Sequence, residues 1–128
     1  MSINDVLAEL RKTYLDALPE RANMIEKLMS ESRYSEVETE FHKLKGTGKT
    51  YGLPEVTQIG EIAERLCEQG STSAEESVPA ALRVLRKVTA ARTAGHPLDL
   101  ENDVDFLYLM ELARELHETT SGRGGRPR

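Results

Sequence analysis

The sequence has little of what several classes of protein require. Among its 128 residues there is one cysteine, Cys67, which excludes a disulfide framework and a multi-cysteine metal site. Tryptophan is absent, and aromatic residues make up only 5% of the chain. No apolar run approaches the roughly 20 residues that span a bilayer, and residues 1–5 lack the basic and apolar regions of a signal peptide. We therefore expect a cytoplasmic protein without membrane association.

A basic block is also missing from the part of the chain that is expected to fold. The formal net charge is −5, which argues against a nucleic-acid-binding protein. Residues 121–128 are rich in glycine and arginine, and we expect them to form a flexible tail. Charged residues make up 30% of the chain and hydrophobic ones 38%, a balance typical of soluble helical bundles.

No segment alternates apolar and polar residues over a useful length, and there is no internal repeat. Apolar residues recur instead at helical spacings of three and four. We expect an all-α fold in a single domain, residues 1–120, with a four-helix-bundle core and additional N-terminal and C-terminal helical segments. The histidine helix described below and the helix after it should form an antiparallel hairpin.

Local signals predict where these helices begin and end. Capping patterns predict starts at Ser2, at Ser35 with Glu38, at Ser73 with Glu76, and at Asn102 or Asp103. Breaks are expected at Pro19, at residues 30–32, at Gly52, at Gly70 and near residues 94–97, and Pro54 suits a first helical turn. Pro79 predicts a later start or a kink in its helix. The last helix should pack on the core through Phe106, Leu109 and Met110, or offer that face to another chain.

One predicted helix carries an exposed histidine on a cationic face. At about 100° per residue, an apolar and small-residue stripe forms on one side. It consists of Val37, Phe41, Leu44, Gly48 and Tyr51. Glu38, Lys45, Gly46 and Lys49 fall on the opposite side, within about 60° of His42. Helical side chains lean toward the N-terminus, so both lysines lean back toward the imidazole. This surface suits a compact anion.

The pattern His42-x-Leu44-Lys45-Gly46, with Gly52 ten residues after the histidine, resembles the signature of histidine-containing phosphotransfer (HPt) domains. The runs at residues 14–21 and 53–55 also resemble bacterial members, so the likeness covers roughly residues 1–94. The glycine and lysine in Thr47-Gly48-Lys49 depart from the usual pattern, which could change affinity without abolishing transfer.

This resemblance implies a phosphorelay carrier. His42 would accept a phosphoryl group and exchange it with aspartates of response-regulator receiver domains, or with a hybrid histidine kinase. The partner would supply Mg²⁺, so the resemblance implies no cofactor, no metal site and no autokinase activity in this chain. An exposed imidazole is largely uncharged at neutral pH and is already a nucleophile. We expect a monomer.

The lysines and glycines near His42 are expected to have different functions. Lys45 and Lys49 are expected to place ammonium groups near the phosphoryl oxygens, and Lys43 is expected to contact the partner. Alternatively, Lys45 and Lys49 are ordinary solvated lysines on the polar face of the helix. Gly46 costs a helix roughly 1 kcal/mol relative to alanine, and clearance for a partner's loops would explain it. Gly48 is expected to allow close helix packing on the core side.

The remaining acidic residues, histidines and cysteine are expected to have structural roles. Glu36, Glu38 and Glu40 are expected to support the helix start and solvation, although Glu38 could disfavour a phosphoryl group on His42. His96, His117 and Cys67 lack the spacing of zinc ligands. Cys67 fits the apolar face of its helix as a small core residue.

Three alternatives compete with the phosphocarrier hypothesis. Gly48-Lys49-Thr50 imitates the end of a phosphate-binding P-loop, but Lys43 occupies the place of its first glycine and a helix precedes it instead of a strand. A kinase dimerisation hairpin usually carries an acidic residue directly after its histidine, where this chain has Lys43. The third alternative is a non-catalytic docking module that binds a receiver or kinase, and the presence of His42, Lys45 and Gly46 counts against it.

Overall fold

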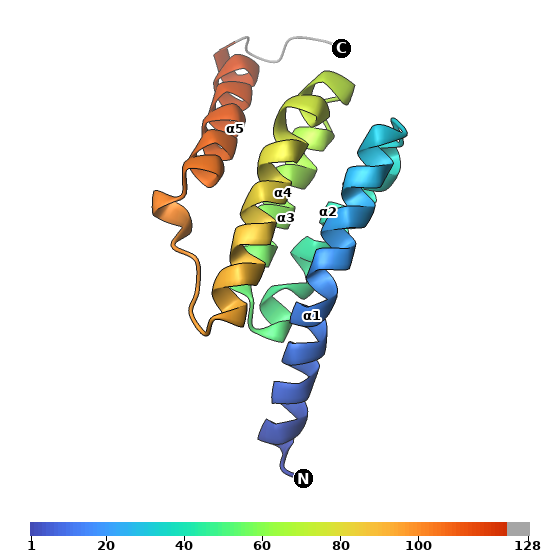
Figure 1. Cartoon of the computed structure of the whole chain (residues 1–128). Helices are drawn as coiled ribbons and strands as arrows, with labels where there is room; N and C mark the ends of the chain where they lie inside the picture. The colour runs from blue at the N-terminus through green and yellow to red at the C-terminus, as the bar shows by residue number, and fades with distance from the viewer. Residues whose placement is uncertain (123–128) are drawn as a thin grey trace.

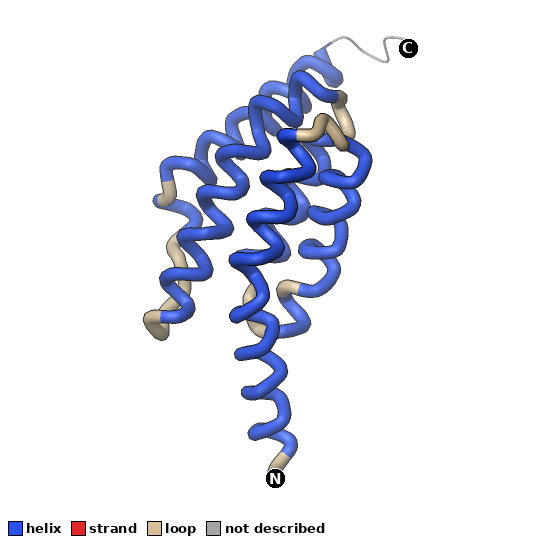
Figure 2. The backbone as a smooth tube through the Cα atoms, turned by 45° about the vertical axis from the view of Figure 1, so that its right-hand side comes forward, coloured by secondary structure: helices blue, strands red, loops and turns tan. Residues whose placement is uncertain are grey.

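The structure, a computed structural model, describes residues 1–122, with side chains to Leu116, and this part of the chain contains helices and no strands. The predicted all-α class is therefore confirmed (Figure 2). The elements are α1 (Ile3–Ser30), α2 (Tyr34–Thr47), α3 (Pro54–Cys67), α4 (Ser71–Thr93) and α5 (Val104–Gly122), with short 3₁₀ turns η1 (Lys49–Tyr51) and η2 (Leu100–Asn102). None of the described helices is long and apolar enough to cross a membrane.

Four helices surround one core. α1 packs against α2 and α4, α3 packs against α2 and α4, and α5 lies outside this bundle against α3 and α4 (Figure 1). Every bundle helix contributes side chains that are fully buried. They include Leu18 and Ile25 from α1, Phe41 from α2, Ile59 from α3 and Leu85 from α4. α5 adds Phe106 and Leu109 to the same core, so this helix extends the bundle as expected.

The first helix is continuous, and the predicted break at Pro19 is wrong. Pro19 lies inside α1, which begins with the predicted Ser2–Asp5 capping box. A proline removes one backbone donor from a helix, but Leu18 and Ala22 are buried on either side of it and hold both halves against the core. The N-terminal part of α1 projects beyond the bundle (Figures 1 and 2).

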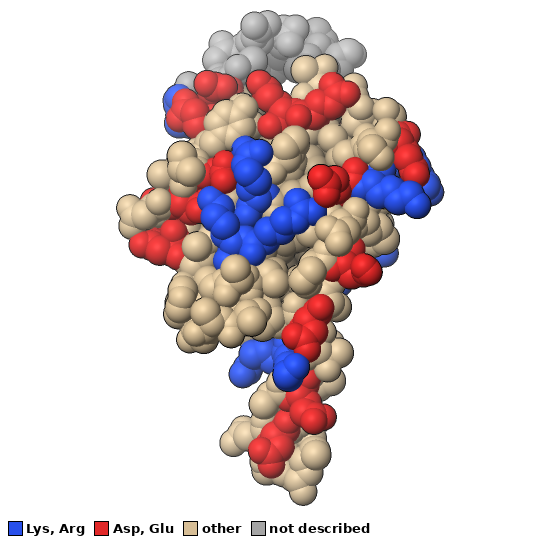
Figure 3. Space-filling model, in the orientation of Figure 1, with Lys and Arg blue, Asp and Glu red and all other residues tan. Residues whose placement is uncertain are grey.

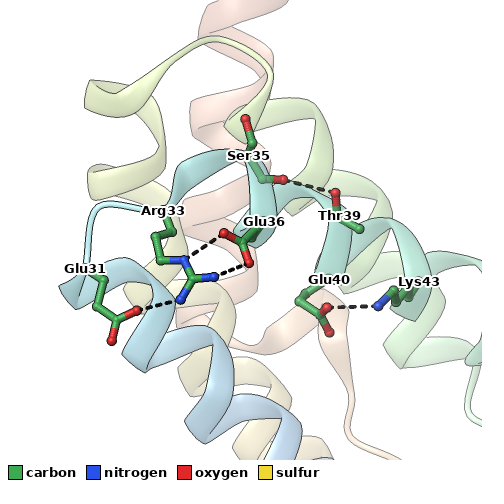
Figure 4. A network of polar contacts seen from close by, with 7 residues as sticks. All are labelled: Glu31, Arg33, Ser35, Glu36, Thr39, Glu40 and Lys43. Atoms are coloured by element: carbon green, nitrogen blue, oxygen red, sulfur yellow. Dashed lines mark hydrogen bonds and ion pairs between the residues drawn. The ribbon is translucent and has the colours of Figure 1, made fainter.

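The second helix begins two residues earlier than predicted and without the expected cap. Its N-cap is Arg33, which makes no side-chain capping bond. The Arg33 guanidinium pairs instead with Glu36 and Glu31, while Ser35 offers its carbonyl to the hydroxyl of Thr39 (Figure 4). Ion pairs therefore organise this turn in place of a capping box.

Three further predictions about helix boundaries differ from the structure. α4 begins at Ser71 after Gly70, and Ser73 lies inside it with its carbonyl accepting from the Ser77 hydroxyl. Pro79 also lies within α4, which neither starts later nor breaks there. α5 continues to Gly122, so the first two residues of the predicted tail are helical, while residues 123–128 lie outside the described residues.

The beginning of α5 matches the prediction, and one of its packing residues does not. The Asp103 carboxylate accepts from the backbone N–H of Phe106, which makes Asp103 the cap. Phe106 and Leu109 are buried, but Met110 is 48% exposed. Met110 lies roughly 100° further around the helix than Leu109, and that rotation takes it out of the interface.

A buried ion pair joins the beginning of α3 to the end of α4. Both oxygens of Glu55 accept from the Arg92 guanidinium, at 2.7 and 2.9 Å, and one also accepts from the backbone N–H of Leu98 at 3.2 Å. Burial opposes ionisation of Glu55, yet these donors bring its pKa below the ordinary value of 4.5. The pair therefore fixes the loop between α4 and α5 while Glu55 stays charged.

We predict that Glu55→Gln lowers the free energy of unfolding at neutral pH by about 2–3 kcal/mol, because it leaves Arg92 without its charged partner. Since the folded-state pKa of Glu55 lies below the unfolded-state value, its contribution is complete above about pH 4.5 and is lost as pH falls through the folded value. Urea denaturation at several pH values measures both effects.

The matched control is Glu26→Gln, which removes an exposed carboxylate that pairs with Arg86 at 2.9 Å. We expect it to cost less than about 1 kcal/mol. Equal losses for the two variants would contradict a special role for the buried pair.

Candidate functional site

His42 lies on the solvent face of α2 with its side chain 65% exposed. Phe41 and Leu44 on either side are completely buried, and they fix the rotation of α2 about its axis. The core contacts of α2 therefore determine that the imidazole faces outward, as its sequence pattern predicts.

A carboxylate from the neighbouring helix holds one edge of this imidazole. Nδ1 of His42 lies 2.8 Å from Oε2 of Glu64 in α3. A carboxylate can only accept a hydrogen bond, so Nδ1 carries the proton. In the neutral ring the lone pair is then on Nε2. Glu64 thus orients the ring and leaves its nucleophilic nitrogen available.

The same carboxylate brings Lys45 to the site. Nζ of Lys45 lies 3.4 Å from Oε1 of Glu64, while Oε2 is the atom that faces His42. The Lys45 side chain is 44% exposed and that of Glu64 only 12% exposed. Lys45 and His42 therefore lie on either side of the largely buried Glu64 carboxylate. The Lys45 ammonium group stays accessible to an anion from solvent.

The separation between α2 and α3 is determined by Gly60. A Cβ atom at this position would lie 2.4 Å from the backbone nitrogen of Lys45 and 2.7 Å from the carbonyl oxygen of Phe41. Only glycine allows the two backbones to approach this closely. Glu64 follows one helical turn after Gly60, so the close approach brings its carboxylate within reach of His42.

Sequence reasoning missed both Gly60 and Glu64. A glycine inside a strongly amphipathic helix was an available signal, since it weakens the helix unless another backbone approaches. The partner of His42 carries no such signal, because the two residues are 22 positions apart and only the packing of α2 on α3 joins them.

The other two lysines of the predicted site, Lys43 and Lys49, are placed differently from Lys45. Lys43 pairs with Glu40 at 3.1 Å on its own helix (Figure 4). Glu40 is itself buried and lies 3.8 Å from Arg21 of α1, so the expectation that it is solvated is wrong. Lys49 lies in η1, beyond the end of α2, where the assumed helical register no longer holds.

The glycines around the site differ sharply in their surroundings. A Cβ at Gly46 would have no atom within 4 Å, so this position is open, as the clearance hypothesis requires. A Cβ at Gly48 would lie 2.6 Å from the backbone nitrogen of Thr57, which confirms the close core-side packing. Gly52 has φ +80° and ends η1 instead of α2, which already ends at Thr47.

Glu64, the partner of His42, belongs to a cluster of three acidic residues. Carboxylate oxygens of Glu38, Glu64 and Glu68 all lie within 4.8 Å of one another. Glu64 already accepts hydrogen bonds from His42 and Lys45. We therefore interpret the three carboxylates as a negatively charged surface and not as a set of metal ligands. Burial, together with these three charges, raises the pKa of Cys67 to about 12 and leaves the thiol protonated.

The P-loop alternative finds no support in this geometry. Residues 48–50 follow the helix α2, and the described part of the chain contains no strand to precede a phosphate-binding loop.

We predict opposite effects for alanine at the two glycines. Gly60→Ala should lower the free energy of unfolding by about 1–3 kcal/mol, because its methyl group meets backbone atoms that cannot move aside. Gly46→Ala should raise it by about 0.5–1 kcal/mol, since the site is open and alanine favours the helix. Thermal and urea denaturation measure both, and a destabilised Gly46→Ala variant would contradict the open surface.

Comparison with known proteins identifies the family of the chain. Residues 9–95 match the family model described as the Hpt domain, and this stretch extends from α1 to the residues just after α4. No curated protein and no solved structure matched the chain. The family match covers more than half of the sequence and includes His42, Lys45, Gly60 and Glu64. The chain therefore belongs to the Hpt domain family, whose general role is histidine phosphotransfer in phosphorelays.

Proposed function

We propose that this protein is a phosphocarrier that accepts a phosphoryl group on Nε2 of His42 and exchanges it with aspartates of receiver domains. One observation carries the proposal. The exposed imidazole has its Nδ1 edge bound by Glu64 at 2.8 Å, which leaves Nε2 as the free nucleophile on the solvent side.

The proposed step is a simple displacement at phosphorus. The bond from phosphorus to the aspartyl carboxylate of the receiver breaks as a bond from Nε2 of His42 forms, and the carboxylate leaves with the electron pair. The proton stays on Nδ1, so the phosphorylated ring is cationic and is stabilised by the Glu64 carboxylate. Lys45 is placed to offset charge on the phosphoryl oxygens.

The partner would supply what this chain does not. Mg²⁺ held by the receiver would neutralise charge on the transferring group. We also propose that the protein has no autokinase activity and acts only as an intermediate between a hybrid histidine kinase, or a phosphorylated receiver, and a second receiver. The open position at Gly46 leaves room beside His42 for a partner's loops.

The decisive test incubates the protein with a panel of phosphorylated receiver domains and Mg²⁺ and measures acid-labile phosphate on the chain. We expect labelled wild-type protein, and no label on His42→Gln, because the glutamine side chain offers no nucleophilic nitrogen. His96→Gln is the matched control, since His96 lies in the loop after α4 and should leave labelling unchanged.

Binding without labelling would contradict the phosphocarrier proposal. If receivers bind the wild-type protein but no receiver transfers phosphate to it, the alternative becomes the better account: a helical docking module that occupies a receiver or kinase without carrying phosphate.

A second prediction concerns Glu64 as a positioning residue. Glu64→Ala should lower the transfer rate about 10- to 100-fold, because Nδ1 loses the acceptor that orients the ring. Glu64→Gln should recover much of the rate, since its amide oxygen also accepts from Nδ1–H. Nitrogen chemical shifts of His42 should report a mixed tautomer in the alanine variant only. Equal rates in all three proteins would contradict this role.

A further inference from the structure

The short turn after α2 carries a lysine without an acidic partner. Lys49 is the first residue of η1, and its side chain is exposed. Lys43 pairs with Glu40 and Lys45 pairs with Glu64, but Lys49 forms no ion pair with any of the described residues. Its ammonium group therefore keeps a charge that no carboxylate of the described chain offsets.

The basic side chains of α4 are in a different situation. Lys and Arg side chains gather in the middle of the face shown in Figure 3, where α4 lies in Figure 1. The basic residues of α4 all pair with carboxylates: Arg83 and Lys87 with Asp105, Arg86 with Glu26, and Arg92 with Glu55. An anion from solvent therefore gains less at that patch than beside Lys49.

Lys49 lies on the same side of α2 as His42. Gly48, the residue before it, has φ −53° and ψ −55°, which are the angles of a right-handed helix. The backbone therefore enters η1 with Lys49 about two turns, roughly 10 Å, beyond His42, although the strict register of an α-helix ends there. Helical side chains lean toward the N-terminus, so the ammonium group extends back toward the imidazole.

Gly46 leaves space between these two residues. It lies about one turn after His42 and one turn before Lys49, and a Cβ atom there would have no neighbour within 4 Å. Nδ1 of His42 faces Glu64, so Nε2 is the nitrogen that is free to bind a phosphoryl group. A phosphoryl group on that nitrogen has open space over Gly46, with Lys45 beside it and Lys49 beyond it.

Residues from two other helices hold η1 in place. The hydroxyl of Thr57 in α3 accepts a hydrogen bond from the backbone N–H of Lys49 at 2.6 Å. From α1, the ring of Tyr14 stacks on that of Tyr51 with centroids 4.7 Å apart, and Nε of Arg11 donates to the carbonyl of Tyr51 at 3.2 Å. This turn of three residues is therefore anchored at both ends, at Lys49 and at Tyr51.

We propose that Lys49 is a second phosphoryl-binding cation and that Thr57 is the residue that positions it. This role rests on the proposed function, since it concerns the same transfer to Nε2 of His42. Charge spreads over the equatorial oxygens of the phosphoryl group in the transition state, and an ammonium group on its open side stabilises that charge. Thr57 holds the backbone from which Lys49 extends, so it acts without touching the phosphoryl group.

Two phosphoryl donors test the proposal on the full chain: a phosphorylated receiver domain with Mg²⁺, and the small molecule phosphoramidate. In phosphoramidate the bond from nitrogen to phosphorus breaks, ammonia leaves with the electron pair, and Nε2 of His42 forms the new bond to phosphorus. Phosphorus NMR follows the phosphohistidine signal in both reactions, and His42→Gln gives the background from the other histidines. Phosphoramidate makes no protein contact, so its rate reports on the site alone.

Lys49→Gln should slow labelling by either donor about 3- to 10-fold, because it removes the cation on the open side. The difference should shrink at about 1 M salt, where the Debye length is roughly 3 Å. The matched control is Lys27→Gln. Lys27 is also exposed and has no ion pair with the described residues, but it lies at the end of α1 and should leave both rates unchanged.

Thr57→Val should slow both reactions about 2- to 5-fold, because the backbone N–H of Lys49 loses its acceptor. Thr57→Ser keeps the hydroxyl and should restore the rate. In the Lys49→Gln background, Thr57→Val should have no further effect, since Thr57 acts through the lysine. Equal slowing by Thr57→Val in both backgrounds would overturn its positioning role.

An unchanged phosphoramidate rate in Lys49→Gln would overturn the role of Lys49. If the same variant raises the KM for the receiver, then Lys49 contacts the receiver and not the phosphoryl group. The proposed function fails separately, if wild-type protein is labelled by phosphoramidate but by no receiver. The phosphoramidate rates then still decide whether Lys49 binds the phosphoryl group.

Discussion

The contact between α2 and α3 at Gly60 is the constraint on which the site depends. Because residue 60 has no Cβ, the backbone of α3 approaches the backbone of α2 at Phe41 and Lys45. That separation lets a carboxylate on one helix reach a histidine on the other within 2.8 Å. A larger residue would widen the gap along both helices, and the imidazole would lose its partner although every site residue were still present. The chemistry of the surface is therefore determined by packing directly beneath it.

Under the proposed function, Glu64 reconciles two requirements of the site that oppose each other. A phosphoryl acceptor needs cations nearby, yet the imidazole needs an anion to hold its proton on Nδ1 and to balance the charge of the phosphorylated ring. One carboxylate serves the second requirement with Oε2 and keeps Lys45 close with Oε1. Glu38 and Glu68 beside it make this side of α2 acidic, so an incoming anion is best received from the open side next to Gly46.

α1 shows how one helix can serve both the core and the surface. The helix face that is buried at Ile25 continues along α1 to the exposed Leu7. The two residues differ only in whether other helices lie opposite them. Pro19 does not divide the two parts, since burial of Leu18 and Ala22 on either side outweighs the single backbone hydrogen bond that a proline removes. A local rule about proline failed here because tertiary packing was stronger.

The sequence by itself determined the helical class, the boundaries at Ser2, Pro54 and Asp103, and the outward direction of His42, because all three depend on periodicities and caps within a few residues. It also indicated that Lys45 shares the solvent face of His42 and that the chain breaks at Gly52, since both follow from local geometry. Tertiary structure alone decided that Glu64 is the partner of His42 and that Glu40 is buried against Arg21. The physical reason is the same in each case: the partner or the burial comes from how separate helices pack, and no spacing along one helix encodes the distance to another.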